Sequence, residues 1–176
     1  GGKFGHWGAE KSSKNNFRSN RWDEMNMGSV VAGVFRHGQK RHVTKAVTAR
    51  LGEGGGLSVC FDPQTLAYRE LWTNGLVSHS EARWGLMAGI FLEGRPMLTT
   101  VPSVGWTADG KWRGGYPPDA IDYHGYHRHG KRVVFSYAHR GAAILDAPWA
   151  IGSGGGPILT RSLHFKDGVD QRTVQL

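Results

Sequence analysis

The sequence predicts an all-β fold: an antiparallel β-sandwich with long loops, or alternatively a distorted barrel. Short runs of alternating apolar and polar residues recur along the 176 residues, and 27 glycines and seven prolines separate them. No helical period extends beyond a single turn, at Ser80–Met87. The clearest pattern is the pair of runs Leu57–Phe61 and Leu66–Trp72, which flank the turn formers Asp62 and Pro63. We therefore expect a β-hairpin at this position.

The remaining strands are predicted in the same way from short alternating runs bounded by turn formers. In the second strand, His42–Leu51, the apolar face carries Val43 and Val47 but is interrupted by Lys45, which favours a sheet edge. The long segment 102–120 is predicted as an irregular loop. The other expected strands are Ser29–Phe35, Leu86–Leu92, Pro96–Val101, Ile121–His127, Arg132–Tyr137, Ala142–Leu145 and Ile158–Phe165. We expect Leu86–Leu92 to form a hairpin with Pro96–Val101, and Ile121–His127 to form one with Arg132–Tyr137.

The chain is long enough for one domain with a sizeable core. Residues 1–27 are polar, basic and rich in Gly, Ser and Asn, so we expect an extended arm or linker followed by a single β domain over 28–176. The chain has no initial Met and stops inside the alternating run 173–176. We expect it to be a fragment of a longer polypeptide.

The net charge of +8 is concentrated at the start of the chain, where residues 1–50 hold ten Lys and Arg against three Asp and Glu. A nucleic-acid site would use the basic cluster over residues 36–50. This interpretation is disfavoured, because single-strand binders combine a basic groove with regularly placed aromatic residues and only Phe35 accompanies the cluster. An acidic partner protein fits the charge better. The candidate partner-binding residues are Arg18, Arg21, Arg36, Lys40 and Arg41.

Seven tryptophans allow two interpretations: they fill a thin β core, or some of them form a platform for a ligand such as a sugar ring. The second interpretation predicts a carbohydrate-binding module. Its candidate residues lie on or beside turns and the 102–120 loop: Trp72, Trp84, Trp106 and Trp112.

The segment 123–130 places His124, His127 and His129 within six residues. Imidazole is a common metal ligand, so a metal or haem site is one interpretation and an exposed hairpin tip is the other. In a regular strand His127 and His129 point the same way while His124 points to the opposite face. Only two of the three would then converge on one ion.

No residue pattern assigns a reaction to this chain. The sequence holds neither a nucleophile elbow nor a phosphate-binding loop, and the single Cys60 excludes an intrachain disulfide and a CxxCH haem attachment. We therefore assign no catalytic residue, expect no cofactor within the chain and leave enzymatic activity open. No apolar run approaches the roughly 18 residues of a membrane-spanning helix.

Three segments, 49–77, 105–112 and 123–149, resemble an uncharacterised β domain of large secreted bacterial proteins, which accompanies quinoprotein-like or sorbosone-dehydrogenase-like propellers and c-type haem domains. The first contains Trp72-Thr73, followed by Asn74-Gly75 where the family has two glycines. The later block is matched by Tyr123, Gly125, Gly130, Val133, Ser136 and Tyr137.

This resemblance implies a periplasmic or secreted protein that acts as a non-catalytic accessory or docking domain. Its partners would be other domains or subunits of a dehydrogenase–cytochrome assembly. Haem c, or a quinone or metal cofactor, would then belong to those partner domains.

Overall fold

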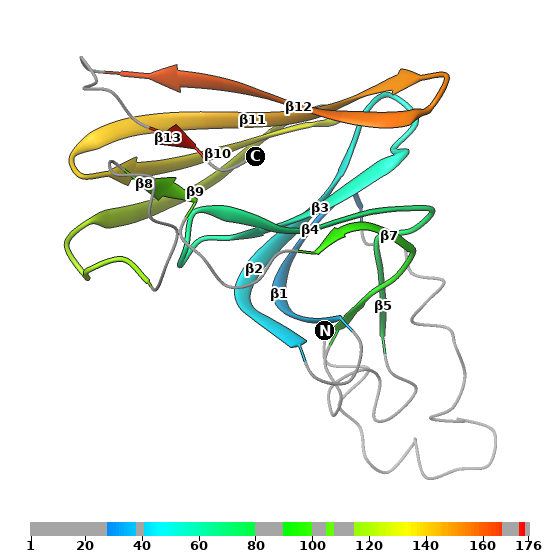
Figure 1. The fold of residues 1–176 in the computed structure, drawn as a ribbon, viewed down its shortest axis with the longest axis horizontal. Coiled ribbons are helices and arrows are strands. Elements are labelled where there is room, and N and C mark those ends of the chain that lie inside the picture. The colour runs from blue at the N-terminus through cyan, green and yellow to red at the C-terminus, as the bar shows by residue number, and fades with distance from the viewer. Residues whose placement is uncertain are drawn as a thin grey trace, which may run out of the picture.

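The computed structural model describes residues 28–37, 41–79, 90–99, 105–107, 115–166 and 173–174. These residues form strands and turns without a helix, which confirms the predicted all-β class. Figure 1 shows a strongly curled sheet with a second sheet across one of its faces, the arrangement of a distorted sandwich or half-barrel. In this described part of the chain, no helix has the length and apolar character needed to cross a membrane.

The strands belong to three sheets. In spatial order, the curled sheet contains β5 (Val77–His79), β6 (Ile90–Leu92), β1 (Val30–His37), β2 (Arg41–Leu51), β3 (Leu57–Asp62), β4 (Ala67–Thr73) and β7 (Arg95–Thr99). The four-stranded sheet contains β12 (Gly156–Phe165), β11 (Ala142–Ser153), β10 (Arg132–His139) and β9 (Ile121–His129). A small third sheet pairs β8 (Trp106–Thr107) with β13 (Thr173–Val174).

The predicted hairpin is present as β3 and β4. Asp62 closes its turn because one carboxylate oxygen accepts a 2.9 Å hydrogen bond from the backbone N–H of Gln64. β3 is buried on both faces, so Cys60 points into the curl of the sheet while Phe61 points toward the four-stranded sheet. The hairpin β9–β10 is also present as predicted. β11 pairs with β12 in a further hairpin, which the sequence did not predict because the expected strand ended at Leu145. The single helical turn predicted at 80–87 lies outside the described residues.

The segment 90–99 contributes one strand near each end of the curled sheet. β6 pairs with β5 and β1, β7 pairs with β4 at the far end, and only Glu93 and Gly94 separate β6 from β7. The sequence predicted that these two strands would pair with each other, and this prediction is wrong. Gly94 allows the chain to pass directly from β6 to β7. It has a φ of 146°, and it lies so close to the carbonyl of Thr73 that a Cβ atom would collide there.

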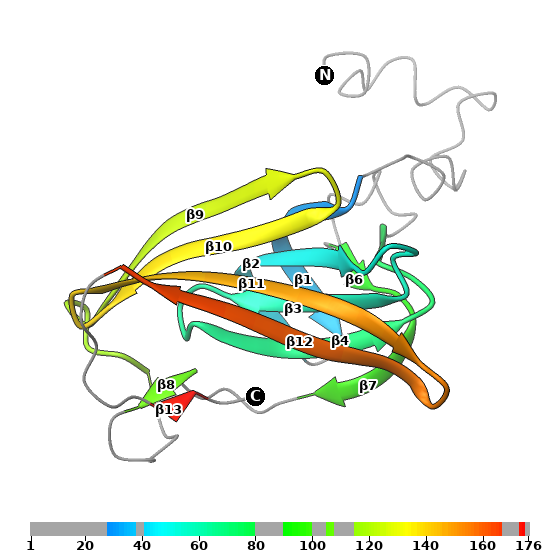
Figure 2. The same cartoon turned by 90° about the horizontal axis from the view of Figure 1, so that it is seen from above.

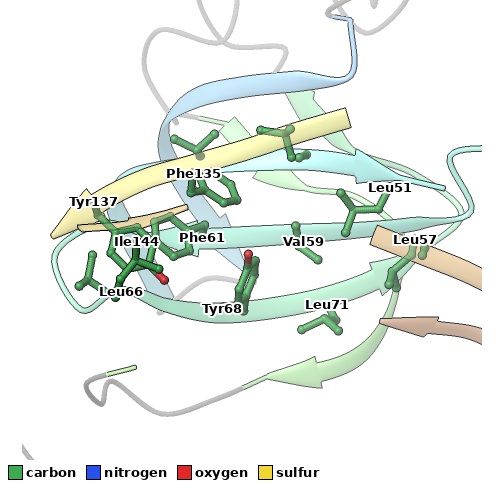
Figure 3. Close-up of a cluster of buried hydrophobic side chains, with 14 of the residues drawn as sticks. Leu51, Leu57, Val59, Phe61, Leu66, Tyr68, Leu71, Phe135, Tyr137 and Ile144 are labelled. Atoms are coloured by element: carbon green, nitrogen blue, oxygen red, sulfur yellow. The ribbon is translucent and has the colours of Figure 1, made fainter. Parts of the chain in front are cut away.

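The main core lies between the two large sheets (Figures 2 and 3). Phe61 stacks on Phe135 of the four-stranded sheet with ring centroids 4.2 Å apart, and the rings of Tyr68 and Tyr137 lie 5.4 and 5.8 Å from it. Residues from both sheets therefore close a single sandwich core. A second, smaller core fills the inside of the curl, and it contains Val31, Phe35, Val43, Ala46, Cys60, Trp72 and Leu76.

The strand β2 is central rather than at an edge, because β1 and β3 flank it. The sequence predicted an edge position from the exposed Lys45. In the structure the register between β1 and β2 shifts at this point, and Lys45 has a φ of 54°. This bulge moves Val43 to the inside of the curl while Val47 stays in the main core. A lysine that breaks the alternation here marks a bulge.

Candidate functional site

The predicted tryptophan platform is not found at the two positions that the structure describes. Trp72 is 3% exposed in the core of the curl, and Trp106 is 2% exposed in the main core. The indole N–H of Trp106 donates a 3.1 Å hydrogen bond to the hydroxyl of Tyr137. Neither indole ring presents a free face to a ligand. Trp84 and Trp112 lie outside the described residues.

The three histidines lie in β9, at the edge of the four-stranded sheet. Tyr123 pairs with Tyr137 and Gly125 with Ser136, so His124 is the additional residue of a bulge. The alternation shifts by one residue at this bulge, and His124 shares the outer face with His127 and His129. The predicted opposite orientation of His124 is therefore wrong.

This common face does not create a metal centre. All three imidazoles are exposed, and His124 Nε2 lies 3.2 Å from a carboxylate oxygen of Asp122. Among the described residues, no three His, Cys, Asp or Glu side chains lie close enough to hold a metal ion. The histidines form an exposed polar row.

The structure places few of the predicted partner-binding cations. Arg36 is half-buried in β1, where its backbone lies between His42 and Phe91 of the neighbouring strands. Arg18, Arg21, Lys40 and the side chain of Arg41 lie outside the described residues.

Sequence reasoning missed a buried polar network between the sheets. The carboxylate of Asp146, which is fully buried, accepts hydrogen bonds from the hydroxyls of Tyr68 (3.1 Å) and Tyr137 (3.0 Å). Arg161 donates to it through Nε (3.3 Å) and Nη2 (2.5 Å), and its side chain is only 4% exposed. The Arg161 guanidinium also lies over the ring of Tyr68, 4.7 Å from the centroid.

This network is closed to solvent and joins β4 of one sheet to β11 and β12 of the other. Burial, together with the negative charge of Asp146, raises the pKa of Tyr68 and of Tyr137 well above the ordinary value. Burial opposes the charge on Arg161, but Asp146 outweighs it and raises the guanidinium pKa. Asp146 and Arg161 form a buried ion pair. We interpret the network as a structural connection between the sheets.

An open cleft lies where the turns of three hairpins meet at one end of the sandwich. It has a volume of about 390 Å³, within the range typical of ligand sites. Lys131, in the β9–β10 turn, donates hydrogen bonds to the backbone carbonyl (2.6 Å) and carboxylate (3.2 Å) of Glu53 in the β2–β3 turn. The lining residues are Leu51, Gly52, Glu53, Gly54, Gly56, Trp149, Ala150, Ile151, Gly152 and Pro157.

The cleft continues onto the outer face of the four-stranded sheet. Trp149 lines the cleft, and the guanidinium of Arg132 lies over its ring, 4.2 Å from the ring centroid. Beyond Trp149, the cross-strand pair Ile151 and Ile158 is 48% and 49% exposed. We call the cleft together with Lys131, Arg132 and Ile158 the loop-end surface.

The sequence held one usable signal for this surface. The strand that begins at Ala142 continues its alternation to Ile151, which places Trp149 and Ile151 on the face opposite the buried Ile144. The predicted strand ended at Leu145, so both residues were missed.

The fold and these contacts define an all-β sandwich domain with a closed core and an open cleft at one end. The chain belongs to a family described as a domain of unknown function (DUF6797), whose model matches residues 59–146, half of its length. The matched segment runs from β3 into β11 and leaves the β2–β3 turn and β12 outside. No curated protein and no solved structure matches the chain.

Proposed function

We propose that this protein is a non-catalytic docking domain, and that the loop-end surface is where it meets its partner. The observation that carries the proposal is the exposed pair of Ile151 and Ile158 beside an open cleft. Adjacent apolar side chains at an exposed surface are typical of interaction sites. The buried polar network, in contrast, is closed to any partner.

The partner we propose is another domain or subunit of an exported dehydrogenase–cytochrome assembly, which would carry haem c, a quinone or a metal. This part rests on the resemblance of segments 49–77, 105–112 and 123–149 to accessory β domains. The basic residues 1–27 fit the same role, because a positive segment steers an acidic partner. The domain itself would act outside the cytoplasm.

A photo-cross-linking amino acid at Ile158 tests the docking role in the assembly isolated from the native host. We expect a specific cross-link from this position to a protein with a dehydrogenase or haem domain. The matched control is Gln64, which is exposed in the β3–β4 turn of the other sheet. An Ile158 position that yields only the background of Gln64 would overturn the proposal.

Carbohydrate binding is the second candidate, and the half-buried Trp149 in the cleft wall is the observation that favours it. Affinity electrophoresis in gels that contain neutral or acidic polysaccharides tests it directly. Retardation that the substitution Trp149→Ala abolishes would support it, and unchanged mobility in every gel would remove it.

A further inference from the structure

The lining of the cleft is suited to a single apolar side chain. Side chains of Leu51, Ile151 and Pro157 are combined there with four glycines, which present backbone and little else. Interfaces obtain much of their binding energy from one or two anchor side chains that fill such pockets. The volume of about 390 Å³ accommodates an aromatic or long aliphatic anchor with its flanking backbone.

The charges beside the cleft are mostly positive. Glu53 is the one carboxylate among its lining residues, and Lys131 already engages it. Arg132 stacks on Trp149, and within the described residues no carboxylate lies within ion-pair distance of its guanidinium. With Glu53 engaged by Lys131, the guanidinium of Arg132 leaves this region with an excess of positive charge, which is complementary to an acidic partner.

Resting on the docking role above, we propose that the cleft binds a partner-protein segment in which an aromatic or long aliphatic anchor is flanked by carboxylates. The anchor enters the cleft between the β2–β3 turn and the β11–β12 hairpin. A flanking carboxylate binds the guanidinium of Arg132, which can donate two parallel N–H hydrogen bonds to the two carboxylate oxygens. A sugar fits less well, because Arg132 already covers the ring of Trp149 on which a sugar would stack.

Two glycines provide a matched pair of variants. A Cβ atom built at Gly152 or at Gly154 meets nothing within 4 Å, so both positions tolerate a side chain. Only Gly152 lines the cleft. We therefore expect that Gly152→Leu fills the cleft without unfolding the protein, and that Gly154→Leu leaves the cleft open.

The test is an NMR titration of the ¹⁵N-labelled chain with the blocked peptide Asp-Trp-Asp-Asp. We expect this probe to shift the amide signals of Gly52, Gly54, Gly56 and Gly152. The peptides Lys-Trp-Lys-Lys and Asp-Ala-Asp-Asp should bind at least about fivefold more weakly, since each lacks one of the two recognised features. Arg132→Ala should weaken binding of Asp-Trp-Asp-Asp by a similar factor. Arg95 is exposed on β7, and Arg95→Ala should leave this binding unchanged.

Three results would overturn the proposal: no shift with the acidic probe, equal binding of the basic peptide, or unchanged binding by Gly152→Leu. Shifts of the same glycines by cellohexaose or oligogalacturonate, without a response to the peptide, would assign the cleft to a carbohydrate instead. One outcome is loss of peptide binding in the Gly152→Leu variant while a photo-cross-linker at Ile158 of the same variant still captures the partner in the native assembly. That result would refute the anchor in the cleft and leave the docking role standing. If the peptide binds as expected but Ile158 gives no cross-link, the docking role fails.

Discussion

Removal of the carboxylate in Asp146→Ala tests whether the buried network joins the two sheets. The change leaves the Arg161 guanidinium buried without its counter-ion and leaves the hydroxyls of Tyr68 and Tyr137 without their acceptor. Breaking a buried ion pair on one side costs about 3–5 kcal/mol, and the loss of the two hydrogen bonds from the hydroxyls to Asp146 places this site toward the upper end. That is a large part of the roughly 5–15 kcal/mol that stabilises a typical domain.

Equilibrium urea unfolding, followed by fluorescence and circular dichroism, measures this loss of unfolding free energy. Asp122→Ala is the matched control, because its contact with His124 is exposed and should contribute nothing measurable. The double variant Asp146→Leu/Arg161→Met removes both charges and should lose less stability than Asp146→Ala alone. A loss below about 1 kcal/mol for Asp146→Ala would show that the network is not a structural connection.

The remaining predictions concern packing, pH and thiol chemistry. Gly105→Ala should lower the unfolding free energy, measured by urea unfolding, by about 1–3 kcal/mol, because its Cβ atom would collide with a backbone carbonyl. The control Gly154→Ala should have no measurable effect, since its Cβ atom meets nothing. Equal stabilities of the two variants would refute the packing described. Burial raises the pKa of Tyr116 and of Tyr123 to about 12, and it also raises the pKa of Cys60, Tyr68 and Tyr137. The unfolded chain therefore loses these protons first, and the urea midpoint should begin to fall near pH 9 and fall more steeply as the pH rises from 10 toward 12. Tyr123→Phe should flatten that fall, and a midpoint constant up to pH 12 would contradict the prediction. Burial also raises the pKa of Cys60, so a thiol-specific disulfide reagent at pH 8 should label it only after unfolding, and rapid labelling of the native chain would show that this core is open.

The sequence predicts strands well where the alternation depends only on neighbouring residues. The β3–β4 hairpin follows from the alternating runs around Asp62 and Pro63, because a strand has a side-chain period of two. The bulges at Lys45 and His124 could not be predicted in this way. Each one depends on the register with a partner strand, and a single inserted residue moves every later side chain to the other face.

The candidate site was less predictable than the strands. Its parts come from turns that lie far apart in the sequence, from Leu51 to Pro157, and contacts such as that of Lys131 with Glu53 arise only when the sheets pack. Trp106 shows the reverse error. Its position in a long loop suggested exposure, but Tyr116 and Tyr137 hold its backbone and its ring in the core. Whether an aromatic residue in a loop is buried or exposed can therefore be decided only from the tertiary structure.

Hydrogen–deuterium exchange of the chain, alone and within the assembly isolated from its native host, measures the docking surface most directly. Docking through the loop-end surface predicts that assembly slows exchange at residues 52–56 and 149–158, while the β3–β4 turn at 63–66 exchanges at the same rate in both states. Slowed exchange confined to other segments, or no change at all, would contradict docking at this surface.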